Sequence, residues 1–179
     1  MNIAAALPAH FRPLPKGNPF HMHAITRGVI GFAAVAMTAI CFFAITRWLA
    51  GFAPVHSGIG NIAVIIHVAA VLPAVPLGGY LLLAPKGTPR HKMLGKIWIC
   101  LMVITAVSIT FIRGGTDFSW IHIFVPITLH GAWKAVTSAK AGNIAAHKKH
   151  LIGMYLGALM IPGLFSFMPT RLMGAWLFG

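Results

Sequence analysis

Acidic side chains are nearly absent from this sequence. Among its 179 residues only Asp117 is acidic, against 14 lysines and arginines. One carboxylate cannot supply the pairs needed for glycoside hydrolysis, carboxylate-bridged two-metal chemistry or proton relays between carboxylates. Cysteine is also scarce, and both copies, Cys41 and Cys100, lie inside apolar runs. The sequence therefore indicates neither a disulfide framework nor a cysteine-based metal site.

Charged residues of either sign make up only 8% of the chain, and hydrophobic residues make up 58%. A soluble domain has about 25% charged residues, so we expect most of this surface to face lipid. The net charge of +13 would suggest nucleic acid as the partner of a soluble chain. Here the bases flank apolar runs, as they do where a membrane protein meets anionic headgroups. We therefore expect membrane lipids, and no nucleic acid, as partners.

The apolar runs predict an all-α transmembrane helical bundle of five spans, a four-helix core plus one N-terminal helix. Residues 1–27 contain four prolines and scattered bases and are interpreted as a cytoplasmic N-terminal arm, with the bundle over 28–179. The spans are expected at about 28–46, 61–84, 94–112, 118–137 and 151–169. Pro73 and Pro76 lie inside the second span, where neighbouring helices can satisfy the carbonyls that a proline frees. The alternative has four spans, with the third or fourth segment lying in the interface.

The basic residues predict the orientation. With the N-terminus in the cytoplasm, 11 of the 14 lysines and arginines lie inside, and Arg47, Arg113 and Arg171 lie outside. This distribution is a strong positive-inside bias. We expect a multi-pass protein of a bacterial inner membrane with its N-terminus in the cytoplasm.

Histidines are the candidate functional residues, because ionisable groups inside a span usually have a function. Six of the ten lie in or beside spans two to five: His67, His91, His122, His130, His147 and His150. The first two are 24 residues apart, and His122 and His147 are 25 residues apart. Two helical hairpins would thus each carry one outer and one inner histidine.

This layout suits haem b, because a six-coordinate haem takes two imidazoles from different helices. We expect His67 and His122 to bind the iron of an outer haem and His91 and His147 that of an inner haem, with His130 and His150 as reserve ligands. The function predicted on this basis is transmembrane electron transfer, with a quinone or a larger membrane complex as partner.

Ordinary roles for the same residues stand beside this hypothesis. His91, His147 and His150 could contact headgroups, His122 could be an interfacial residue, and His67 and His130 could bond backbone carbonyls across the bundle. The chain would then be a cofactor-free accessory subunit of a larger inner-membrane complex or, as a third alternative, a small transporter or lipid-binding protein. The sequence leaves open whether the chain is an enzyme.

Two turns on the expected inner face carry a basic cluster. We expect five of its residues, Arg90, Lys92, Lys96, Lys148 and Lys149, to contact anionic lipid headgroups or haem propionates. Positive-inside topology alone explains the same cluster equally well.

Three motifs carry a resemblance to a known family. They are His67, the run His91-Lys92-Met93-Leu94-Gly95-Lys96, and the run Gly142-Asn143-Ile144-Ala145-Ala146-His147-Lys148. From about Ile62 to Thr170 the chain resembles an uncharacterised family of predicted bacterial membrane proteins, a domain of unknown function. The resemblance implies a membrane fold but no activity, and His122 and His130 are outside the family's pattern. More distantly, the two-plus-two layout of histidines looks like that of diheme cytochromes b, an analogy that does not establish function.

Overall fold

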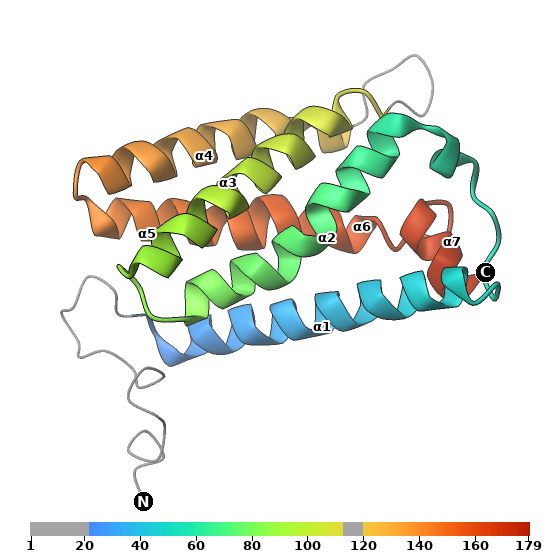
Figure 1. The fold of residues 1–179 in the computed structure, drawn as a ribbon, viewed down its shortest axis with the longest axis horizontal. Helices are drawn as coiled ribbons and strands as arrows, with labels where there is room; N and C mark the ends of the chain where they lie inside the picture. The colour runs from blue at the N-terminus through green and yellow to red at the C-terminus, as the bar shows by residue number, and fades with distance from the viewer. Residues whose placement is uncertain (1–21, 113–119) are drawn as a thin grey trace, which may run out of the picture.

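The computed structural model describes residues 22–112 and 120–179. Within these ranges every regular element is a helix (Figure 1), which confirms the predicted all-α class. The elements are α1 (Ala24–Leu49), η3 (Ser57–Gly60), α2 (Ile62–Leu83), α3 (Pro89–Ile109), η4 (Trp120–Ile123), α4 (Phe124–Lys140), α5 (Ile144–Gly153), η5 (Met154–Met160), α6 (Ile161–Phe165) and α7 (Leu172–Phe178). The segment η5 is π-helical, and it joins α5 to α6 without a break.

Three of these helices, α1, α2 and α3, are long and apolar enough to cross a membrane. The prediction of a protein with membrane-spanning helices is thus confirmed. α4 has 17 residues, and the helical run that follows it is divided by the π-helical segment.

Several helices begin earlier than the hydropathy pattern predicts. α1 starts at Ala24 instead of residue 28, α3 at Pro89 instead of 94, and α5 at Ile144 instead of 151. The last two starts are set by capping: the Thr88 hydroxyl accepts a hydrogen bond from the His91 amide, and the Asn143 side chain accepts one from the Ala146 amide. The first two turns of both helices therefore contain basic residues that the prediction had assigned to loops. The predicted arm lies mostly, and Arg113 and Asp117 lie wholly, outside the described residues.

The two turns that follow α2 and α4 lie at the same end of the bundle as the start of α1 (Figure 1). We call this the basic end, because Arg27, Lys86 and Lys140 lie there with the expected lipid-binding bases. Both turns use a glycine with positive φ, Gly87 at 81° and Gly142 at 73°, a conformation that residues with a Cβ rarely adopt. The opposite end holds the end of α1, the start of α2 and the helix α7 (Figure 1).

The centre of the bundle is packed around two adjacent glycines of α2. A Cβ on Gly78 would lie 2.5 Å from Nε1 of Trp98 in α3 and 2.7 Å from the ring of Tyr155 in η5. On Gly79 it would lie 2.5 Å from Cβ of Ala34 in α1. The glycines therefore let three helical elements approach α2 at one level, and Trp98 and Tyr155 are almost fully buried there.

Both large side chains at this level donate hydrogen bonds to carbonyls of α2. Trp98 Nε1 donates to the carbonyl of Ala74 at 2.9 Å, and the Tyr155 hydroxyl donates to that of Val75 at 3.1 Å. These carbonyls belong to the turn that contains Pro73 and Pro76. These two polar side chains of the core are thus satisfied inside the bundle, as an apolar surrounding requires.

Candidate functional site

His67 is held by α3. Its Nδ1 lies 3.1 Å from the carbonyl oxygen of Thr105 and 3.2 Å from the hydroxyl of Ser108. The Thr105 carbonyl can only accept, so Nδ1 donates to it and carries the proton. Nε2 then keeps its lone pair, which is the arrangement found in histidines that bind metal ions.

His147 has the same arrangement at the opposite end of the bundle. It lies in the first half of α5, and its Nδ1 donates to the carbonyl oxygen of Ala135 in α4 at 2.8 Å. In the neutral imidazole Nε2 therefore also keeps a lone pair. His67 is a predicted outer ligand and His147 is a predicted inner ligand. The sequence pattern had paired each of them with a histidine from another helix.

His91 is the predicted partner of His147, and both residues lie at the basic end, where their pairing stays a prediction. His91 is half-buried in the first turn of α3, close enough to Lys86 and His147 to interact with their charges. Its Nδ1 is buried and has no hydrogen-bond partner among the described residues. A buried nitrogen without a partner is costly, so a ligand or an ordered water that contacts this atom would stabilise the ring.

His122 is the predicted partner of His67, and this outer pairing stays a prediction. His122 is half-buried in η4, directly before α4. α3 packs against both α2 and α4, and the hydrogen bonds of His67 turn its ring toward α3.

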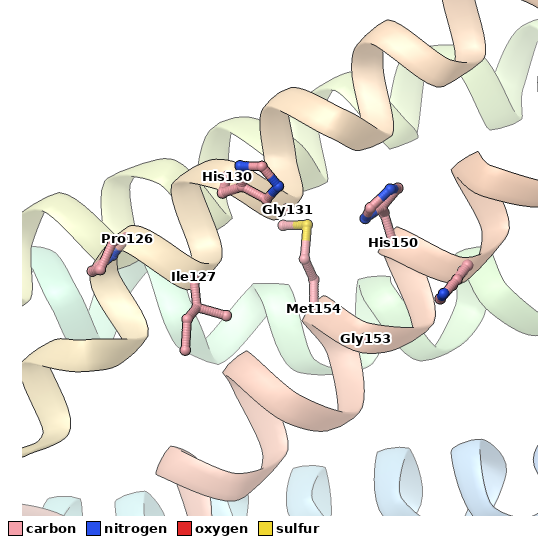
Figure 2. A pocket seen from close by; sticks show the side chains of 8 residues that line it. Pro126, Ile127, His130, Gly131, His150, Gly153 and Met154 are labelled. Atoms are coloured by element: carbon pink, nitrogen blue, oxygen red, sulfur yellow. The ribbon is translucent and has the colours of Figure 1, made fainter.

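The two reserve histidines meet at a different place. His130 of α4 and His150 of α5 line one groove with a cavity volume of about 520 Å³ (Figure 2). The exposed His130 ring also lies edge-on to Trp133, with 5.9 Å between the ring centroids. The groove walls include Gly131, Gly153 and Met154, and the sequence pattern had favoured packing over ligation as the role of Met154. Its signal was its spacing of four residues from His150, which puts both side chains on one helix face.

The predicted anion contacts gather at the basic end. Arg90, Lys92, Lys96 and Lys149 are exposed, and Lys148 is half-buried. Arg90 and His91 also line a second hollow of about 360 Å³ together with Tyr80, Ala84, Pro85 and Thr88.

Lys86 and Arg27 join this cluster, although the sequence pattern had not included them among the anion contacts. Lys86 lies in the turn before α3, and its Nζ donates to the carbonyl of Leu82 at 2.7 Å. Burial, and then the positive charges of Arg27 and Lys148, lower the pKa of the Lys86 ammonium to about 8. Three chain segments therefore place positive charges close enough to disfavour one another.

The cluster also lies where helix dipoles favour negative charge. The first turns of α3 and α5 contain no acidic residue, but Arg90 and Lys92 follow one start and Lys148 follows the other. A helix N-terminus carries a partial positive charge, which bases do not balance. An external anion at this end would relieve both the dipole and the repulsion between side chains.

The described residues contain no group of three or more histidine, cysteine or acidic side chains that could hold a metal ion. A haem iron needs only two protein ligands. The finding therefore concerns ions bound by three or more such side chains and does not test the histidine pairs predicted to bind haem.

Comparison with known proteins gives a family. No curated protein matches the chain, and no solved structure matches it. A family described as "Predicted membrane protein (DUF2306)" matches residues 64–174, which contain His67, both predicted inner ligands and the two turns of the basic end. The match covers more than half of the chain and agrees with the resemblance seen in the sequence, so this protein belongs to the DUF2306 family of predicted membrane proteins.

Proposed function

We propose that this protein is a membrane-embedded b-type haem protein that carries electrons across the bacterial inner membrane. One observation carries the proposal: His67 and His147 each donate Nδ1–H to a backbone carbonyl of a neighbouring helix. This contact fixes the tautomer and leaves Nε2 available for iron. The two sites lie near opposite ends of the bundle, as a path across a membrane requires.

The proposal includes five spans. Beside α1, α2 and α3, the run from η4 through α4 (Trp120–Lys140) and the run from α5 through α6 (Ile144–Phe165) would each cross the bilayer. At 1.5 Å per residue each run is about 30 Å long, which matches the hydrocarbon core. The N-terminus would lie in the cytoplasm, because the basic end then faces inward.

The inner site would use His147 and His91. The two imidazoles are close enough for electrostatic interaction, and the buried Nδ1 of His91 has no hydrogen-bond partner among the described residues. In the outer site, His67 would bind iron opposite His122. When bound, haem supplies one-electron redox chemistry at each site, and the helices orient the imidazoles and keep water away.

The basic end would hold anions in this function. The bases around Lys86 and the first turns of α3 and α5 suit carboxylates or phosphates. Haem propionates of the inner site and acidic lipid headgroups present the same chemistry, and a quinone or a larger complex would exchange electrons with the protein.

Histidine substitutions test the proposal. His67→Ala and His147→Ala should each lower bound haem by about half, because each removes one ligand of a different site. His56→Ala is the control, since His56 accepts a hydrogen bond from the Gly58 amide in a surface turn and should leave haem content unchanged. Haem content is measured per protein after purification of the full chain in detergent. Equal haem content in wild type and in the three variants would overturn the proposal.

A further inference from the structure

The groove between α4 and the junction of α5 with η5 contains donors of a particular kind. Figure 2 shows the imidazoles of His130 and His150 and the thioether of Met154 around one space. His150 and Met154 are one helical turn apart on one face, a spacing that lets two side chains bind one ion.

The third donor, His130, comes from the facing helix α4 at the same level. Met154 packs on Gly131, the residue after His130: a Cβ on Gly131 would lie 2.7 Å from Cγ and 3.1 Å from Sδ of Met154. The absence of a side chain at Gly131 therefore lets the sulfur reach the surface of α4 beside His130. Two nitrogen donors and one sulfur donor thus come from two packed helices.

The same packing separates this site from the haem sites. α4 and η5 touch at Gly131 and Met154, so no layer between them is free for a planar macrocycle. An ion needs no such layer. The groove therefore fits a small ion, although His130 and His150 had been the reserve haem ligands.

The backbone at Met154 has a form that is common at functional sites. The π-helical segment begins at Met154, and π-helical turns are rare and frequently occur at functional sites. The exposed Gly153 also lines the groove, and a Cβ on it would meet no atom within 4 Å. The groove is thus open beside Gly153 and at the exposed His130, while the Met154 thioether forms its buried floor.

The chemistry of the donors selects the ion. Thioether and imidazole are neutral ligands, and thioether favours copper(I) over hard cations. The chain has one acidic residue and a net charge of +13, and Lys149 lines the groove. A divalent ion would meet more repulsion and no carboxylate among the described residues that line the groove, whereas a monovalent soft ion suits the site.

We propose that His130, His150 and Met154 form a binding site for copper(I). The site is independent of the haem proposal, because it uses none of the four preferred haem ligands.

Copper(I) binding to the full chain tests this site. The protein is purified in detergent through a tag without histidine, and copper(I) is titrated anaerobically in competition with a chromogenic chelator. Met154→Leu keeps the size and apolar character of the side chain and should weaken binding about tenfold or more, since even partners behind a ligand contribute about ten- to a hundredfold. His130→Gln with His150→Gln should weaken it further. Met93→Leu is the matched control, because Met93 is an exposed methionine of α3.

X-ray absorption at the copper edge gives a second readout. A sulfur neighbour should be present in wild type and in Met93→Leu and absent in Met154→Leu, which keeps the test valid if the double histidine variant does not fold. Equal affinity and an unchanged sulfur signal in Met154→Leu would overturn the proposal. Zinc(II) binding as tight as copper(I) binding would contradict the preference for a soft ion.

Discussion

At the scale of single residues, the histidines differ in what their ring nitrogens contact. His67 and His147 donate to carbonyls of other helices, the Nδ1 of His91 is buried without a partner among the described residues, and His56 accepts from a nearby amide. The sequence shows all ten as the same residue type. Spacing predicted that His91 and His147 belong together, but it could not show which nitrogen of each ring is occupied.

Lys86 should titrate with a midpoint near pH 8 in neutral detergent, because burial and the charges of Arg27 and Lys148 lower its pKa. Between about pH 8 and the ordinary value of 10.5 the unfolded chain would hold a proton that the folded chain has lost. The folded state is therefore stabilised as pH rises through this window, and Lys86→Gln should remove that rise. The midpoint is measured as the rate of amine labelling at Lys86 against pH, followed by mass spectrometry. The change in stability is measured as the thermal unfolding midpoint of wild type and Lys86→Gln against pH.

Vesicles with acidic lipids provide the comparison for this titration. An anionic headgroup near Lys86 favours the protonated amine, so the midpoint should move to higher pH than in vesicles of neutral lipid. A midpoint above pH 10 in neutral detergent would contradict the crowding of charges at the basic end. Equal midpoints in the two kinds of vesicle would mean that acidic headgroups do not bind near Lys86. The bases of the basic end would then serve only to set the topology.

At the scale of helices, hydropathy predicted α2 almost to the residue but misplaced the starts of α3 and α5. Span prediction treats bases as loop residues, whereas Thr88 and Asn143 begin helices ahead of those bases. The π-helical form of η5 and the short helix α7 were not predicted. α7 depends on tertiary contacts, including the stacking of Trp176 on Trp48 at 4.7 Å between centroids, and no local apolar period encodes such contacts.

The contact between α2, α3 and η5 makes Gly78 a sensitive position. Gly78→Ala should destabilise the fold by about 1–3 kcal/mol, because its Cβ would overlap Trp98 and Tyr155. Gly95→Ala in α3 is the matched control: its Cβ would meet no atom within 4 Å, and alanine favours a helix by about 1 kcal/mol over glycine. Thermal unfolding in detergent should show a lower midpoint for the first variant and an equal or higher one for the second. The reverse order would contradict this packing.

At the scale of the whole molecule, composition alone predicted the class of the protein. A charged fraction of 8% and runs of apolar residues indicated membrane helices, and three helices meet the requirements of a span. The number of spans is harder to predict, because the fourth and fifth segments contain histidines and lysines that lower their hydropathy. Function is harder still, since the same histidines suit a haem ligand, a headgroup contact or an internal hydrogen bond.

Five spans and a cytoplasmic N-terminus predict opposite exposure of two loops. In a background without cysteine, Ser57→Cys should react with an impermeant maleimide added to spheroplasts, and Lys140→Cys should react only in inverted vesicles. Ser57 begins η3 between α1 and α2, and Lys140 ends α4. Labelling of both positions from the same side would show that α4 does not cross, and inverted labelling of both would reverse the orientation.

Haem binding is tested most directly by the absorption spectrum of the full chain, expressed with haem supplied and purified in detergent. The account predicts a Soret band, α and β bands that sharpen on reduction, and about two haems b per chain, one for each histidine pair. A spectrum without a Soret band would contradict the central claim. The chain would then be better explained as an accessory subunit, and it should co-purify with a larger membrane complex.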